Sequence, residues 1–120
     1  MLKENHDLEG ALKKYIVLLK EAEYFEAHEV LEEAWHPLRK ADHPLKNLLK
    51  GLINGAVAFE HLKRNRKNAQ SNARRVMASF ERHKHLAREE IVYAVLFEKA
   101  CQCIEQLKEK HKEVFDVLVP

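Results

Sequence analysis

Helical periodicity is clearest in residues 24–35, which read YFEAHEVLEEAW. Apolar side chains recur in this stretch at intervals of three and four residues, at Tyr24, Ala27, Leu31, Ala34 and Trp35. Such spacing places apolar side chains on one face of a helix and leaves the opposite face to polar residues. Glu26 and Glu33 fall on that polar face, so the stretch predicts an amphipathic helix that packs against other helices.

The same periodicity continues on both sides of this stretch. It predicts helices at about 8–23, 24–36, 44–64, 69–87 and 89–112. Asp7 is the expected N-cap of the first helix, and Glu89 and Glu90 suit the positive end of the fifth. Pro37 is expected to end or kink the second helix, because it lacks an N–H and clashes with the preceding turn.

Composition supports a fold built from long helices. Only three glycines and three prolines occur in 120 residues, which disfavours a fold of short strands and turns. Gly51 and Gly55 lie four apart on the third helix, where a close approach by a neighbouring helix would explain them. The length suits one domain, so we expect residues 1–120 to form a single all-α bundle of four to five helices.

The remaining composition excludes several classes of protein. A hydrophobic share of 46% and a charged share of 33% exclude a disordered chain. No apolar run approaches the ~20 residues of a membrane span, and residues 1–6 lack the apolar core of a secretion signal. Cys101 and Cys103 form no disulfide framework. A cytoplasmic protein without a membrane partner is therefore expected.

Positive charge is concentrated in the middle of the chain. Residues 63–88 contain nine lysines and arginines against Glu81 alone, whereas the segments before and after each carry a net charge of −3. Arg64, Arg66 and Lys67 precede a helix N-terminus, which favours anions, and Arg74 and Arg75 follow on that helix. The block is either a solvated face or a binding site for an anion, nucleic acid or an acidic protein.

Histidine and glutamate residues form a second candidate site. His28 falls on the apolar face of residues 24–35, with Glu32 one turn further on, and the third helix contributes Glu60 and His61. Glu60 and Arg64, four residues apart, are spaced for an ion pair. We expect a polar cluster between the second and third helices, made up of His28, Glu29, Glu32, Trp35, Glu60 and His61, with Phe25 and Trp35 as walls.

This cluster has three interpretations. Its members either satisfy one another and fix the helix packing, or bind a small ligand, or hold a divalent metal ion through His28, Glu32 and His61. In the metal case Glu29 is the candidate base of a hydrolase. The spacing departs from the His-Glu-x-x-His zinc motif, because Glu32 stands at the second histidine position. Phosphate-binding loops, dinucleotide fingerprints and nucleophile motifs are absent from the sequence.

These residues resemble a known family, the small all-helical prokaryotic proteins named domain of unknown function 309. Residues 24–35 are similar to its F-F-E-A-H-E-x-x-E-x-x-W motif, and residues 50–58 with His61 are similar to its G-L-I-Q-x-A-x-A…H segment. The resemblance covers about residues 8–75 and implies a helical fold without an established activity. The matching signature positions are His28, Glu29, Glu32, Trp35, Gly51 and His61.

One turn departs from the family pattern. The family's Gly-Asn-x-x-Gly-Ala sequence is replaced by RNRKNA at residues 64–69, so both glycines are missing and the resemblance does not imply the geometry of this turn. The sequence as a whole favours a non-catalytic binding or scaffold module, with a protein partner or a homodimer as possible assemblies. A metal-binding protein, including a metal-dependent hydrolase, is the alternative, and nucleic-acid binding through residues 63–88 is a third hypothesis.

Overall fold

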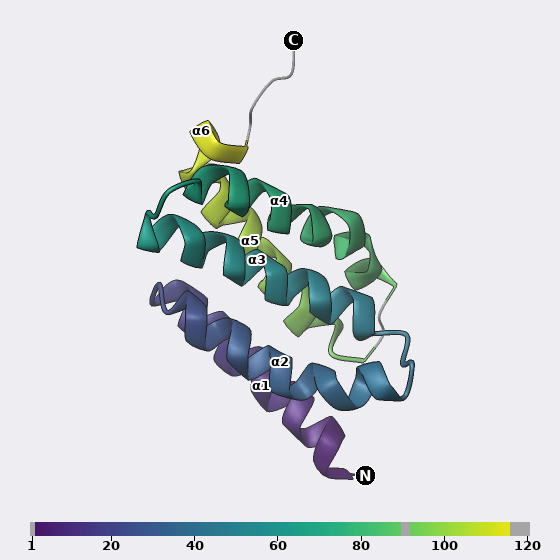
Figure 1. The fold of residues 1–120 in the computed structure, drawn as a ribbon. Coiled ribbons are helices and arrows are strands. Elements are labelled where there is room, and N and C mark those ends of the chain that lie inside the picture. Colours follow the sequence, from purple (N-terminus) through teal and green to yellow (C-terminus); the bar gives the residue numbers. More distant parts are fainter. Residues whose placement is uncertain (1, 90–91, 116–120) are drawn as a thin grey trace.

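The computed structural model describes residues 2–89 and 92–115, with side chains described from Leu8 onward. Its helices are α1 (Leu2–Lys20), α2 (Tyr24–Lys40), α3 (Lys46–Arg64), α4 (Ala69–His83), α5 (Ala94–Lys110) and the short α6 (Lys112–Phe115), with a 3-10 helix, η1 (Lys84–Arg88), between α4 and α5. Within these residues no strand occurs, and the predicted all-α helical bundle is confirmed (Figure 1).

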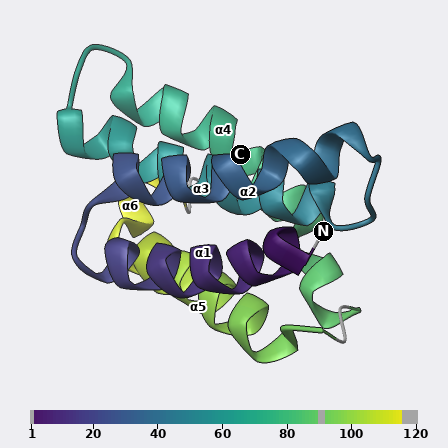
Figure 2. The same ribbon diagram turned by 90° about the horizontal axis from the view of Figure 1, so that it is seen from below.

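The helices are arranged in two layers. One layer holds α2, α3 and α4 side by side, with α3 in the middle, and the other holds α1 and α5 (Figure 2). Helix α1 packs against both α2 and α5, and α5 also contacts α3. Helix α4 is therefore the edge of its layer, with its main contact along α3. The described residues contain no helix long and apolar enough to cross a membrane.

A shared hydrophobic core fills the space between the layers. Its largest buried side chains, Tyr15, Phe59, Phe80 and Phe97, come from α1, α3, α4 and α5. No charged side chain among the described residues is fully buried. The polar and charged groups of the candidate sites therefore lie at the margins of this core, where water still reaches them.

The glycines of α3 mark two places where other helices come close. A Cβ atom added at Gly51 would lie 3.2 Å from both the Cα of Phe80 and the carbonyl oxygen of Ser79, which belong to the backbone of α4. A Cβ atom at Gly55 would lie 3.0 Å from Ile104 Cδ1 on α5. The expected close approach of neighbouring helices at these glycines is confirmed.

Two expected helix ends in the first half of the chain were wrong. Helix α1 begins at Leu2, so Asp7 lies inside it and is not the N-cap. Helix α2 continues through Pro37 to Lys40, and the Ala41 N–H still donates to the Pro37 carbonyl oxygen at 3.1 Å. A proline removes only its own N–H, so the last turn can persist where tertiary contacts hold it. The indole of Trp35 supplies such a contact by donating to the Lys46 carbonyl oxygen at 3.1 Å.

The ends of the last two long helices also differ from expectation. Helix α4 ends at His83, and residues 84–88 continue as a 3-10 helix instead of α-helix. Helix α5 begins at Ala94, not at Glu89, and Glu90 lies outside the described residues. Its N-cap, Tyr93, has a left-handed backbone with φ of 63°. The apolar spacing alone did not predict the interruption between α4 and α5, because apolar residues continue across it.

A buried hydrogen bond joins α1 to α3, and its phenol donor makes the free energy of unfolding depend on pH in the alkaline range. The Tyr15 hydroxyl donates to the Leu52 carbonyl oxygen at 2.6 Å, and burial raises the pKa of this phenol well above its usual value of 10. Above about pH 10 the unfolded chain releases the phenolic proton while the folded chain keeps it, so the free energy of unfolding falls as pH rises.

We expect Tyr15→Phe to flatten this decline. At neutral pH the variant should lose about 1 kcal/mol, the net value of a typical hydrogen bond. Urea denaturation between about pH 8 and pH 11 measures both effects. A decline as steep in the variant as in the unsubstituted protein would assign the alkaline loss of stability to other groups.

Candidate functional site

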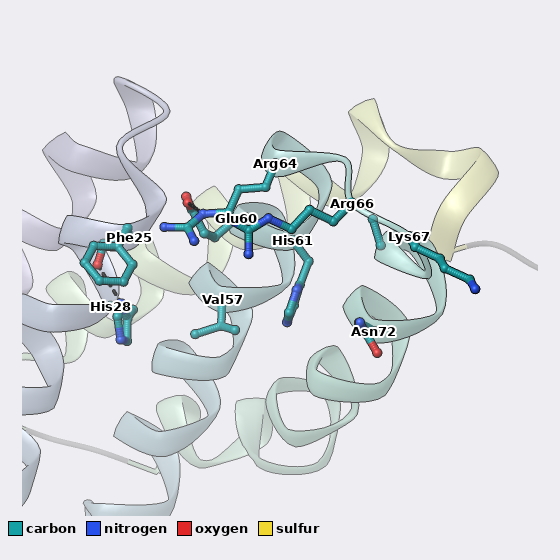
Figure 3. Close-up of a pocket in the computed structure, with 10 residues that line it drawn as sticks. Phe25, His28, Val57, Glu60, His61, Arg64, Arg66, Lys67 and Asn72 are labelled. Carbon is teal, nitrogen blue, oxygen red and sulfur yellow. Dashed lines mark hydrogen bonds and ion pairs between the residues drawn. The ribbon is translucent and has the colours of Figure 1, made fainter.

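A cavity of about 380 Å³ opens between α2, α3 and the turn that joins α3 to α4 (Figure 3). Cavities of this size fall within the range typical of small-molecule sites. We call it the α2–α3 pocket. It is lined by Phe25 and His28 of α2, by Val57, Glu60, His61 and Arg64 of α3, by Arg66 and Lys67 of the turn, and by Ala69 and Asn72 of α4.

On the α2 side, Phe25 and His28 form one unit. The His28 Nδ1 lies 2.6 Å from the Phe25 carbonyl oxygen, and the two rings meet edge to face with centroids 4.9 Å apart. A carbonyl oxygen can only accept, so Nδ1 carries the proton of this hydrogen bond. The other ring nitrogen, Nε2, lies 3.8 Å from a carboxylate oxygen of Glu32. The His28–Glu32 proximity expected from their spacing is therefore present.

On the α3 side, Glu60 is neutralised by a neighbour. Its carboxylate accepts a short hydrogen bond from Arg64 Nε, which confirms the ion pair expected from their spacing. The guanidinium of Arg64 also lies over the Phe25 ring, 5.4 Å from the ring centroid, and so links α3 to α2. Among the described residues Glu60 is the only carboxylate that lines the pocket, and it is thus already paired.

The other polar side chains at the pocket have no protein partner. Within the described residues, the side chains of His61, Arg66, Lys67 and Asn72 form no hydrogen bond or ion pair. His61 lies on the α4 side of Val57, whereas Phe25 and His28 lie on its other side (Figure 3). Three cationic side chains face one carboxylate at this pocket, so its electrostatic balance favours an anion.

The turn between α3 and α4 contains no glycine but does contain two residues with positive φ. Asn65 and Asn68 both adopt left-handed backbone conformations, with φ of 50° and 66°. Asparagine tolerates this region better than most residues, so Asn68 can stand where the family carries a glycine. Arg64 is the last residue of α3 and needs no glycine conformation. The substituted turn thereby presents Arg66 and Lys67 beside the pocket.

Several residues of the predicted polar cluster lie elsewhere. Glu29 and Glu32 border a second, open hollow, together with Glu26, Glu33 and His36 of α2 and Lys14 of α1. Trp35 lies further along α2, where its ring is flanked by Arg39 and Lys50 at 5.3 and 4.5 Å. The indole therefore joins α2 to α3 and does not wall the pocket, while Phe25 does line it. Of the six cluster residues, only His28, Glu60 and His61 line the α2–α3 pocket.

The described residues contain no preformed set of ligands for the metal ion that the sequence analysis considered. In the part of the chain that the structure describes, no three His, Cys, Asp or Glu side chains lie together in a way that could hold a metal ion. His28 is near Glu32, but His61 lies on the other side of Val57 from His28 (Figure 3). Metal binding through these residues stays a prediction, and elemental analysis of untagged protein purified without chelator tests it.

The two cysteines are unsuited to nucleophilic chemistry. Both are free thiols, with Cys103 buried and Cys101 half-buried. Burial is the main cause that raises the pKa of Cys101 to about 11 and also raises the pKa of Cys103. The thiolate is the reactive form of cysteine, so little of the reactive species exists near neutral pH.

Sequence reasoning missed Val57, Ala69 and Asn72 as pocket residues. Asn72 carried the best available signal, because it lies three residues after Ala69 and four before Val76 and therefore points toward the same side as these apolar residues. A polar side chain in that position indicates either a buried hydrogen bond or a pocket. Only the packing of α4 on α3 distinguishes these two outcomes.

Comparison with known proteins identifies the family. The family described as "Domain of unknown function (DUF309)" matches residues 12–73, which is more than half of the chain. This segment contains α2, α3 and all ten residues that line the pocket. No curated protein and no solved structure matches the chain. The chain belongs to the DUF309 family.

Proposed function

We propose that this protein is a non-catalytic binding module that holds a small anionic ligand in the α2–α3 pocket. The observation that carries the proposal is that His61, Arg66, Lys67 and Asn72, whose side chains have no partner among the described residues, all line one cavity. All four can donate hydrogen bonds, and two carry permanent positive charge. Charged donors of this kind form the stronger hydrogen bonds with phosphate or carboxylate groups.

The other wall of the pocket suits an apolar part of the same ligand. Phe25 is 45% exposed and, with Val57 and Ala69, gives the cavity an apolar lining. The Arg64 guanidinium, held by Glu60, covers part of the Phe25 ring. A compact molecule with an aromatic or aliphatic body and one anionic group therefore matches both halves of the pocket. In the part of the chain that the structure describes, no Ser, Thr or Cys lines it, which supports binding over nucleophilic catalysis.

Phenyl phosphate is a suitable probe because it combines a ring with a phosphate. Titration of ¹⁵N-labelled protein, followed by NMR, is expected to shift amides of α3 and the α3–α4 turn with a Kd of about 1 mM, typical of a fragment-sized ligand. Phenol lacks the charge and should bind at least about tenfold more weakly, since charge-assisted hydrogen bonds contribute about 1.5–3 kcal/mol.

The double variant Arg66→Ala/Lys67→Ala should lose at least about tenfold in affinity for phenyl phosphate. Its matched control is Lys99→Ala/Lys110→Ala, which removes two exposed cations from α5 and should bind as the unsubstituted protein does. Equal losses in the two variants would show that net charge alone attracts the probe. Absence of any shift at about 10 mM phenyl phosphate would reject the proposed ligand class.

The cellular location and the domain organisation of this module are part of the same proposal. We place it in the cytoplasm as a single domain over residues 1–120. Two free thiols support a reducing compartment. The contribution of α1 to α5 to one hydrophobic core supports a single folding unit.

A further inference from the structure

The outward face of α4 carries cations that no protein group neutralises. Arg75 and Arg82 are exposed and lie seven residues apart, a spacing that returns both side chains to nearly the same line along a helix. Ala73, Met77 and Phe80 are the buried residues of this part of α4, on its opposite side. Neither arginine forms an ion pair within the described residues. We call the row of Ser71, Arg75, Ala78 and Arg82 the α4 face.

The charges near this face do not offset it. Glu81 is the only acid in residues 63–88, and its carboxylate is held by Lys84 at 2.8 Å and by Lys108. Arg74, on the flank of the α4 face, donates to the Val114 carbonyl oxygen at 3.3 Å, so its charge also remains without an acid. Helix α4 is the edge of its layer, which leaves this side open to a partner (Figure 1).

The residues of the α4 face indicate which kind of anionic partner, an acidic protein or a nucleic acid, fits it better. Protein interfaces rely on a desolvated centre of apolar and aromatic side chains. The α4 face offers only Ala78 as an exposed apolar residue, since Phe80 is fully buried. A polyanion needs no such centre, because cations that contact phosphates release condensed counterions and bind through that release. The chemistry of this surface therefore fits a nucleic acid better than an acidic protein.

We propose that the α4 face binds the phosphodiester backbone of nucleic acid without reading its sequence. The fifteen residues of α4 span about 22 Å, and the phosphates of one strand recur about every 3.4 Å along the axis of a duplex, so the helix length equals the axial rise of about six phosphates. No aromatic side chain on this face can stack on a base, which leaves phosphates as the contact. Arg75 and Arg82 do not line the α2–α3 pocket, so this site is independent of the proposed function.

Fluorescence anisotropy with a labelled mixed-sequence duplex of about 20 base pairs tests the proposal. The unsubstituted protein should bind with a Kd of about 10 μM or lower at about 50 mM salt, and log K should fall with log salt at a slope of about −3. The variant Arg75→Glu/Arg82→Glu should lose at least tenfold in affinity and about two units of that slope. Duplexes of different sequence should bind equally.

A charge-matched variant separates local contact from general attraction. Lys99→Glu/Lys110→Glu makes the same change in net charge on α5, in the other layer, and should bind within about twofold of the unsubstituted protein. Melting curves confirm that both variants fold. Absence of binding at about 50 mM salt would overturn the proposal, as would equal losses in the two variants. Poly-glutamate that competes as well as unlabelled duplex would also overturn it and would point to an acidic protein.

Discussion

Replacement of Gly51 by leucine should lower the free energy of unfolding by about 3 kcal/mol or more. A Cβ atom at this position would already lie 3.2 Å from the Phe80 Cα and from the Ser79 carbonyl oxygen. Both are backbone atoms of α4, so relief requires movement of a whole helix and not of a side chain. The three further carbons of leucine would force α3 and α4 apart along their contact. Urea denaturation, with the native fold checked by circular dichroism, measures the loss.

Gly10 is the matched control for this prediction. It lies in α1, is exposed, and has no atom within 4 Å of an added Cβ. Gly10→Leu should therefore stabilise the protein by about 0.5–1 kcal/mol through helix propensity alone. If Gly51→Leu stabilised the protein by a similar amount, the close contact between α3 and α4 would be contradicted.

Truncation of Phe59 to alanine should cost about 3–5 kcal/mol, which is the range for a fully buried aromatic ring. Phe59 is 1% exposed, and its ring contacts those of Tyr24, His111 and Phe115 with centroids 5.6–5.7 Å apart. It thereby joins α2, α3 and the chain around α6. The cavity left by its removal cannot be filled by these rings without displacement of α6.

Phe25→Ala removes the same side chain at an exposed site and serves as the control. Because Phe25 is 45% exposed, its loss should change stability by less than about 1 kcal/mol, while phenyl phosphate binding should weaken measurably. Thermal and urea unfolding, together with the NMR titration, separate the two effects. A loss of stability as large as that of Phe59→Ala would contradict the burial that distinguishes the two rings.

The fold could be predicted largely because apolar spacing is a local property. Leu48, Leu49, Leu52 and Phe59 of α3 recur at intervals that place them on one face of a helix, and all of them are in the core. Helix ends were less predictable because they depend on contacts with other helices. Pro37 illustrates this point, since the bond from Trp35 to the Lys46 carbonyl holds the last turn of α2 against α3. The 3-10 segment at 84–88 contains the apolar residues Leu86 and Ala87, which continue the apolar pattern of α4, so spacing could not distinguish this segment from α-helix.

The candidate site was predictable where it depends on one helix and unpredictable where it depends on several. The ion pair of Glu60 with Arg64 and the proximity of His28 to Glu32 both follow from i,i+4 spacing. The position of Trp35 outside the pocket depends on where α2 crosses α3, which no local pattern contains. The same holds for Asn72, which reaches the pocket because the left-handed Asn65 and Asn68 fold α4 back along α3.

The most direct test of the anionic-ligand pocket is a crystal structure with 4-bromophenyl phosphate, whose bromine can be located by anomalous scattering. Our account predicts a bromine peak beside Phe25 and Val57, with the phosphate within hydrogen-bonding distance of Arg66 or Lys67. It also predicts the loss of that peak in Arg66→Ala/Lys67→Ala. A peak in another hollow, or none at a concentration ten times the measured Kd, would contradict the assignment of this pocket as the binding site.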